Sequence, residues 1–108
     1  MSEFSIACET SDDGQHHVVS LSGELDFASV PAVRAFLLRL NGDVEVNCTA
    51  LDFVDSAGLG LFVAYHQALA QQGKRLRLRR LSGDCYRLFE VAGLITYLDL
   101  ETAASETG

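Results

Sequence analysis

The chain has 108 residues, of which 48% are apolar, so it is long enough for one domain with its own core and short for two. This composition excludes a disordered tail and a disulfide scaffold. The 15 acidic residues outnumber the 8 basic ones and give a formal charge of −7. That charge argues against nucleic-acid binding and against an anionic membrane surface, because both need a basic protein surface.

Periodicity and turn residues predict alternating strands and helices along the chain. Asp13-Gly14 is typical of a hairpin turn, and Pro31 suits the first turn of a helix. Asn41-Gly42 and Gly73 are typical of helix ends. The predicted strands lie at about 4–10, 16–22, 44–49, 75–79 and 97–100. The predicted helices lie at about 29–40, 56–72 and 83–92.

The order β-β-α-β-α-β-α-β implies βα units with parallel neighbouring strands. The strands at 44–49 and 75–79 each have one polar face, whereas a sheet covered on both sides would be apolar throughout. The sequence therefore predicts an α/β single domain, with a mixed sheet of about five strands and three to four helices mainly on one face. We expect this domain to span residues 1–100, followed by a flexible C-terminal tail at 101–108.

Cysteine usage and the N-terminal sequence indicate a cytoplasmic protein. Cys8, Cys48 and Cys85 are widely spaced, odd in number and without metal-ligand spacing, so we expect small buried thiols in a reducing compartment. The sequence MSEFSIACE is acidic, unlike the start of a signal peptide. The longest apolar stretch, at about 57–65, is too short to span a bilayer, so no membrane insertion is expected.

Two clusters of titratable residues have simple structural interpretations. His16 and His17 are neighbours in a predicted strand, so they point to opposite faces and cannot easily bind one metal ion. The stretch from Lys74 to Arg80 holds five of the eight cations. We interpret it as the solvated face of a strand, with partner docking as the alternative. The sequence predicts no metal and no cofactor.

The most informative segment is LDFVDSAGLG at 51–60, between a strand and a helix, where α/β folds place ligands. Asp55 and Ser56 are both residues that cap helix starts, and a phosphate at such a position lies in a favourable field. Gly58 and Gly60 each destabilise a helix by about 1 kcal/mol relative to alanine, which suggests close approach of another backbone or of a partner. The simpler interpretation is that Asp55 and Ser56 merely cap a core helix.

This segment matches neither the phosphate-binding loop GxxxxGK[ST] nor the nucleophile elbow GxSxG. No catalytic triad or carboxylate pair is apparent, so the chain is expected not to be an enzyme. The helix at 56–72 is apolar on two faces, which favours a partner-binding helix over one that is buried all round. One face, which also includes His66 as a structural histidine, carries Leu59, Phe62, Val63 and Leu69. The opposite face carries Leu61, Ala64 and Ala68.

Three strings, LSGELD at 21–26, DFVDSAGLGLF at 52–62 and RLFEVAGL at 87–94, together resemble the bacterial anti-anti-sigma factors of the STAS domain family. The resemblance covers roughly residues 4 to 100 and implies the STAS fold. It also implies a partner switch in transcription regulation. The unphosphorylated protein would bind an anti-sigma factor that is also a serine kinase, and so free the sigma factor. Phosphorylation by that kinase would end the binding, and a serine phosphatase would reverse it.

Carried over to this sequence, the resemblance makes Ser56 the phosphorylated residue and Asp26 a kinase contact near it. The surface that binds the partner is then expected to include Glu24, Asp26, Asp55, Ala57, Gly58, Leu59 and Leu61. The sequence departs from the family pattern at Asn47, where an aspartate is common, and at Ala57, which replaces a second serine or threonine. A further departure is Ala92, where threonine or serine is common.

Two other functions are compatible with parts of the sequence. A stand-alone STAS subunit of a transporter or of a lipid-trafficking complex would use the same fold, with a structural serine and no kinase. A nucleotide-binding or hydrolytic protein is the other alternative, but this sequence lacks a phosphate-cradling loop and a catalytic base.

Overall fold

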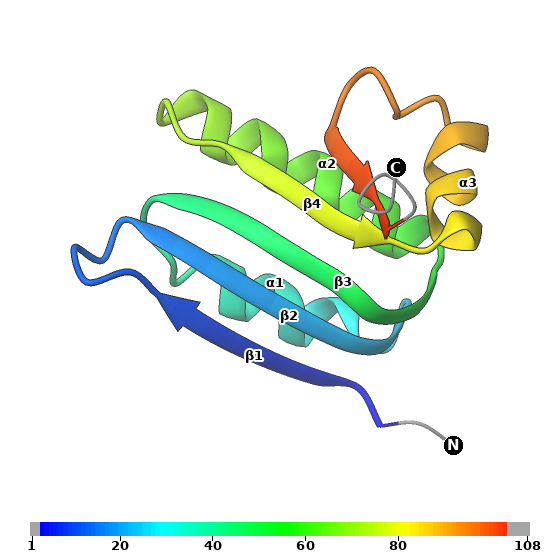
Figure 1. Ribbon diagram of the computed structural model, residues 1–108, viewed down its shortest axis with the longest axis horizontal. Helices are drawn as coiled ribbons and strands as arrows, with labels where there is room; N and C mark the ends of the chain where they lie inside the picture. Colours follow the sequence, from blue (N-terminus) through cyan, green and yellow to red (C-terminus); the bar gives the residue numbers. More distant parts are fainter. Residues whose placement is uncertain (1–2, 104–108) are drawn as a thin grey trace.

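The computed structural model describes residues 3–103 as a five-stranded sheet with three helices (Figure 1). The strands follow one another across the sheet in chain order, β1-β2-β3-β4-β5. Only the β1–β2 pair is antiparallel. The strands are β1 (Ser5–Thr10), β2 (His16–Leu25), β3 (Asp43–Val54), β4 (Leu76–Leu81) and β5 (Asp99–Thr102). The helices are α1 (Val30–Leu37), α2 (Ser56–Gln71) and α3 (Gly83–Val91). The predicted fold class is confirmed.

The helices cover one face of the sheet because that face is apolar. Val19, Val46 and Leu78 point toward the helices and are at most 1% exposed, whereas their strand neighbours other than Val18 are polar. Phe62 of α2 and Phe89 of α3 meet in this core with ring centroids 6.0 Å apart. The one-sided arrangement follows from the alternation of apolar and polar residues over residues 44–48 of β3 and 76–79 of β4.

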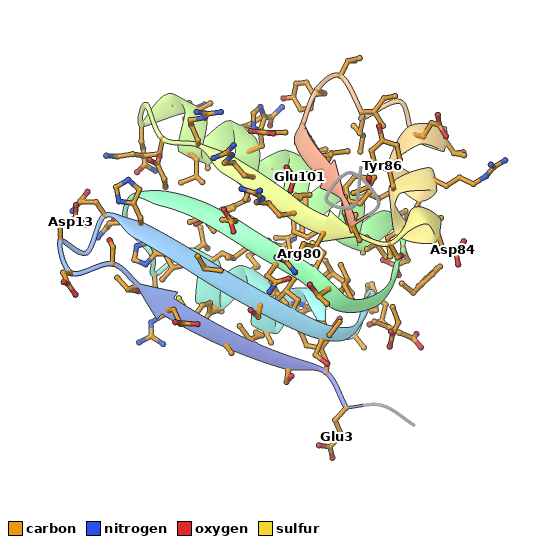
Figure 2. All side chains as sticks on the ribbon, in the orientation of Figure 1. Glu3, Asp13, Arg80, Asp84, Tyr86 and Glu101 are labelled. Atoms are coloured by element: carbon orange, nitrogen blue, oxygen red, sulfur yellow. The ribbon has the colours of Figure 1, made fainter. Side chains whose placement is uncertain are left out.

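The helix-free face carries ion pairs between neighbouring strands. Arg79 of β4 reaches Glu45 of β3 at 3.5 Å and Glu101 of β5 at 2.8 Å (Glu101 is labelled in Figure 2). Arg75 and Arg77 both lie 3.3 Å from Asp99. The predicted basic cluster therefore pairs largely with carboxylates of this same sheet, as expected for a solvated strand face.

Strands β2 and β3 run further than their hydrophobic alternation predicts. Their register shifts twice, between Ser20 and Ser22 and between Gly23 and Glu24, because β3 has one extra residue at each place. Such bulges break the period of two while the pairing continues. As a result β2 and β3 end at Leu25 and Val54.

The last strand is also displaced from its prediction. It spans Asp99–Thr102 and so includes Glu101 and Thr102, which the sequence analysis assigned to the tail. Residues 104–108 of that expected tail lie outside the described residues. The Arg79–Glu101 contact explains why a segment of low apolar content is held in the sheet.

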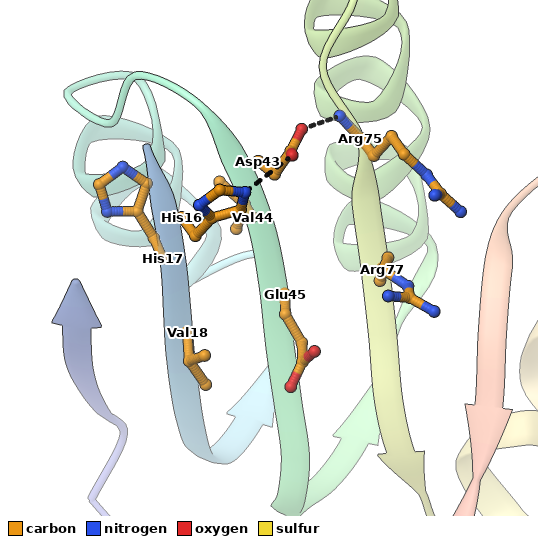
Figure 3. Close-up of a pocket in the computed structure, with 8 residues that line it drawn as sticks. All are labelled: His16, His17, Val18, Asp43, Val44, Glu45, Arg75 and Arg77. Atoms are coloured by element: carbon orange, nitrogen blue, oxygen red, sulfur yellow. Dashed lines mark hydrogen bonds and ion pairs between the residues drawn. The ribbon is translucent and has the colours of Figure 1, made fainter. Parts of the chain in front are cut away.

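The two histidines and the cysteines lie in different surroundings. His17 is buried, with Nε2 donating to the Asn41 carbonyl (2.7 Å) and Thr10 Oγ1 2.8 Å from Nδ1. His16 faces Asp43 at 3.5 Å across a pocket of about 280 Å³ (Figure 3). Cys48 and Cys85 are free and 1% exposed, and burial raises the pKa of the Cys48 thiol to about 12. Cys8 is free but only half-buried, contrary to the expectation, because it lies on the edge strand β1.

Residues 3–103 contain neither a membrane-spanning helix nor a metal-binding cluster. No helix in this range is long and apolar enough to cross a membrane. In the same range, no three His, Cys, Asp or Glu side chains are grouped so that they could hold a metal ion.

Candidate functional site

The candidate site lies where β2 and β3 end side by side. Leu25 and Val54 are register partners at the carboxyl ends of these parallel strands. The next residues along the chain are Asp26 and Asp55, so both aspartates leave the sheet at the same edge. The register thus brings together two motifs that lie far apart in the sequence.

Asp55 fixes the start of α2. Its backbone is extended (φ −92°, ψ −174°), and its Oδ1 accepts a hydrogen bond from the Gly58 N–H at 3.0 Å, which is the geometry of an N-cap. Its Oδ2 accepts a second hydrogen bond, from the Phe27 N–H at 3.0 Å. Its own N–H donates to the Leu25 carbonyl at 3.1 Å. Asp55 therefore joins the β2–α1 loop to the first turn of α2.

Ser56 is the first residue of α2 and is exposed. Its hydroxyl has no hydrogen-bond partner among residues 3–103. The serines at the starts of the other two helices differ in this respect. Ser82 Oγ accepts from the Cys85 N–H at 3.1 Å, and Ser29 Oγ donates to the Glu24 carbonyl at 2.8 Å. Because Asp55 provides the cap, the Ser56 hydroxyl is free to meet a partner.

Asp26 shapes the loop that precedes α1. Its Oδ1 accepts from the backbone N–H groups of Ala28 and Ser29, each at 3.0 Å. Its backbone N–H donates to Ser29 Oγ at 2.9 Å. The Asp26 carboxylate is half-buried, and Glu24, two residues earlier, is exposed. Asp26 therefore stabilises the loop that lies beside the start of α2.

The two glycines of the motif have different surroundings. A Cβ at Gly58 would lie 2.8 Å from the Leu25 carbonyl oxygen and 2.7 Å from Val54 Cγ1. Gly58 is therefore required for α2 to pack against the strand ends, as expected for a close backbone approach. A Cβ at Gly60 would meet no heavy atom within 4 Å in the described part of the chain.

The predicted faces of α2 need correction at Leu61. Leu61 is 3% exposed and belongs to the core with Phe62, Tyr65 and Leu69, whereas Leu59 and Val63 are only half-buried. The sequence placed Leu61 opposite the core because both stripes of this helix are apolar. What decides between them is Tyr65, whose buried hydroxyl donates to the Leu37 carbonyl of α1 at 3.0 Å. His66 stacks edge-on against Tyr97, with ring centroids 5.0 Å apart, which suits its predicted structural role.

Apolar surface flanks the α2 start on both sides. A groove of about 460 Å³ between α2 and α3 is lined by Ser56 and Leu59, with the exposed Phe53 and Val91 beside them. Asp84, labelled in Figure 2 at the start of α3, also lines it.

A second groove, of about 470 Å³, lies between α1 and α2 and has Ala57 and Gly60 in its lining. Phe27 also lines this second groove, with its ring 83% exposed, and was not among the residues predicted from the sequence. The sequence does carry a signal for it, since Phe27 is a large apolar residue directly after Asp26 in the β2–α1 loop.

Comparison with known proteins agrees with this geometry. The family model described as "Mlab, STAS domain" matches residues 8–101. The chain is 36% identical over 93 residues to the anti-sigma-B factor antagonist of Bacillus subtilis (strain 168), a match that covers 83% of this chain and 84% of that protein. It is 39% identical over 90 residues to the anti-sigma-B factor antagonist of Staphylococcus aureus (strain NCTC 8325 / PS 47), covering 80% and 83% of the two chains.

A solved structure shares the fold. The phosphorylated form of the Bacillus cell fate determinant SpoIIAA superposes with a TM-score of 0.68 at 24% identity, and the match covers 95% of this chain and 96% of that one. Sheet, helices and sequence relatives therefore agree, and the chain belongs to the STAS domain family.

Proposed function

We propose that this chain is an anti-sigma factor antagonist controlled by phosphorylation of Ser56. Its unphosphorylated form would bind an anti-sigma factor that is also a serine kinase, and so free a sigma factor. The names of the relatives in Bacillus subtilis and Staphylococcus aureus support the antagonist role. The observation that carries the proposal is the Ser56 hydroxyl, which is exposed beside a cap that does not use it.

The chemistry of the switch follows from the surroundings of Ser56. A phosphate adds about 1.5 to 2 negative charges at neutral pH. The first turn of α2 favours that charge, so the domain should stay folded. A partner surface that fits a neutral hydroxyl would instead bury an unpaired charge, which costs several kcal/mol and lowers affinity about a hundredfold or more. Phosphorylation would thus act by weakening the interface with the partner. Asp26 and Asp55 add further negative charge beside the phosphate.

In this proposal the protein is a cytoplasmic binding module and not an enzyme. ATP would be consumed by the kinase, and a separate serine phosphatase would restore the hydroxyl. The surface that meets the kinase would comprise the α2 start with the β2–α1 loop, including Glu24, Asp26, Asp55, Ala57 and Leu59. Gly58 is buried against the strand ends and would act only by setting the position of α2. Leu61 would contribute only through the floor of the α1–α2 groove, because it is 3% exposed.

The test is incubation of the chain with ATP and each anti-sigma factor kinase encoded in the same genome, followed by mass spectrometry. We expect one phosphate, located on Ser56 and absent from Ser56→Ala, while Ser82→Ala is modified like the unsubstituted chain. No phosphate on Ser56 with any of these kinases would exclude the proposal and favour a stand-alone STAS subunit of a larger complex. ATP turnover by the chain alone would favour a nucleotide-hydrolysing protein.

A further inference from the structure

Gly60 has no packing role within this domain. It is exposed in α2, and glycine is among the least favourable residues inside a helix. A Cβ at Gly58 would overlap the Leu25 carbonyl, but a Cβ at Gly60 would meet nothing within 4 Å among residues 3–103. A side chain is thus missing at a place where this fold leaves room for one. Such a position suits the close approach of a second surface.

Phe27 forms one wall of the groove that Gly60 lines. Its ring is 83% exposed, yet its backbone N–H is held by the Asp55 carboxylate at 3.0 Å. An exposed aromatic ring on an anchored backbone loses little conformational freedom when it binds, and aromatic residues are enriched among the residues that dominate binding energy. The buried Leu61 provides the apolar floor of the same groove.

Arg34 of α1 is the charged residue of the groove lining, where the others are apolar. Within the described residues its guanidinium has no ion-pair partner, whereas Arg75, Arg77 and Arg79 all pair with carboxylates. An unpaired cation beside an apolar hollow complements a carboxylate that arrives next to an apolar side chain.

We infer that the α1–α2 groove receives an apolar side chain of the anti-sigma factor partner, with a partner carboxylate pairing with Arg34. This inference rests on the proposed function and specifies how the partner is held. It also adds to the switch, because Ala57 of the groove directly follows Ser56. A phosphate on Ser56 would stand beside the groove and repel the carboxylate that Arg34 attracts.

The first test fills the groove. Gly60→Leu is compared with Gly83→Leu, since Gly83 is also an exposed helical glycine with open space around its Cβ but lies outside the groove. The probes are the purified anti-sigma factor kinases encoded in the same genome, and affinity is measured by calorimetry. We expect Gly60→Leu to lower affinity at least tenfold and Gly83→Leu to change it less than twofold, with native circular dichroism for both variants.

The second test removes the Phe27 ring and reverses the charge of Arg34 in separate variants. Phe27→Ala and Arg34→Glu should each weaken binding by tenfold or more. Their controls, Leu38→Ala and Arg39→Glu, alter an exposed apolar residue and an exposed cation outside the groove and should have little effect.

The outcomes separate this inference from the proposed function. The inferred role of the groove would be wrong if Gly60→Leu, Phe27→Ala and Arg34→Glu all kept the affinity of the unsubstituted chain. If Ser56→Asp still abolished binding in that case, the proposed phosphorylation switch would stand. Failure of the unsubstituted chain to bind any of the kinases would overturn both. Self-association of the chain that Phe27→Ala abolishes, seen by sedimentation, would assign the groove to a second copy and overturn the inference.

Discussion

The carboxylate of Asp55 accepts a hydrogen bond from the backbone N–H of Phe27, a residue 28 positions earlier in the chain. The other oxygen of the same carboxylate caps α2 through the Gly58 N–H. One side chain thus sets the position of the β2–α1 loop relative to the helix that begins with Ser56. Every surface proposed to meet a partner depends on this single carboxylate.

We therefore expect Asp55→Ala to lower the free energy of unfolding by about 1 to 3 kcal/mol, because a cap and a charge-assisted hydrogen bond are lost together. Asp52→Ala is the matched control, since Asp52 is an exposed aspartate three residues earlier and its substitution should change stability by less than about 0.5 kcal/mol. Urea denaturation measures both. Equal midpoints for the two variants would contradict the role given to Asp55.

The glycines of α2 should respond to alanine in opposite directions. Gly58→Ala is expected to lower the free energy of unfolding by about 1 to 3 kcal/mol, because its methyl group would press on the Leu25 carbonyl and Val54. Gly60→Ala is expected to raise it by about 1 kcal/mol, as alanine favours the helix. Thermal melting of the two variants beside the unsubstituted chain gives both signs, and destabilisation by Gly60→Ala would mean that Gly60 serves the fold after all.

Substitution of Ser56 should separate binding from folding. Ser56→Asp is expected to retain the backbone NMR chemical shifts outside the first turn of α2 while affinity for the kinase falls about a hundredfold, which corresponds to about 2.7 kcal/mol. Ser56→Ala should bind normally. Widespread chemical-shift changes in Ser56→Asp would show that the switch works by refolding, contrary to the interface mechanism.

We predict that ionisation of Tyr65 lowers the stability of the fold at alkaline pH. Burial raises the pKa of Tyr65 from 10.0 to about 12, so its neutral form is favoured in the folded state. Its contribution to stability is fully present below pH 10 and is lost as the pH rises toward 12. The loss is on the order of 1 to 3 kcal/mol. Tyr65→Phe should lack this loss, while at neutral pH it should be about 1 kcal/mol less stable because the hydrogen bond to Leu37 is gone. Urea denaturation at pH 8 and pH 11 compares the two chains, and parallel pH dependence would contradict the assignment.

The boundary of the domain can be tested by truncation. A chain that ends at Leu100 lacks Glu101, which pairs with Arg79, and Thr102, which is the register partner of Leu81. We expect it to be less stable by about 1 kcal/mol than a chain that ends at Ala103, because the half-buried Arg79–Glu101 ion pair and one end of a strand are lost. Equal melting temperatures would mean that the C-terminal tail begins at residue 101, as predicted from the sequence.

The sequence predicted the element order and the mixed, one-sided sheet because apolar and polar residues alternate over residues 44–48 of β3 and 76–79 of β4. It predicted that Asp26 and Asp55 lie at one edge because the strand ends of βα units gather on the same edge of a sheet. The two bulges that set their register do not show in the hydrophobic pattern. The core face of α2 was misassigned at Leu61, because this helix carries two apolar stripes and the sequence alone does not show that Tyr65 donates to α1. The division of roles between Asp55 and Ser56 needed side-chain positions, as either residue type can cap a helix.

That division has an evolutionary consequence. Because Asp55 caps the helix start and the Ser56 hydroxyl makes no hydrogen bond within residues 3–103, selection on the signalling role proposed for Ser56 is uncoupled from selection on folding. A descendant can lose the hydroxyl, exchange it for another or regain it without passing through a poorly folded intermediate. In the proposed switch, a regulated and an unregulated form of this chain would thus differ by a single, structurally neutral substitution at position 56.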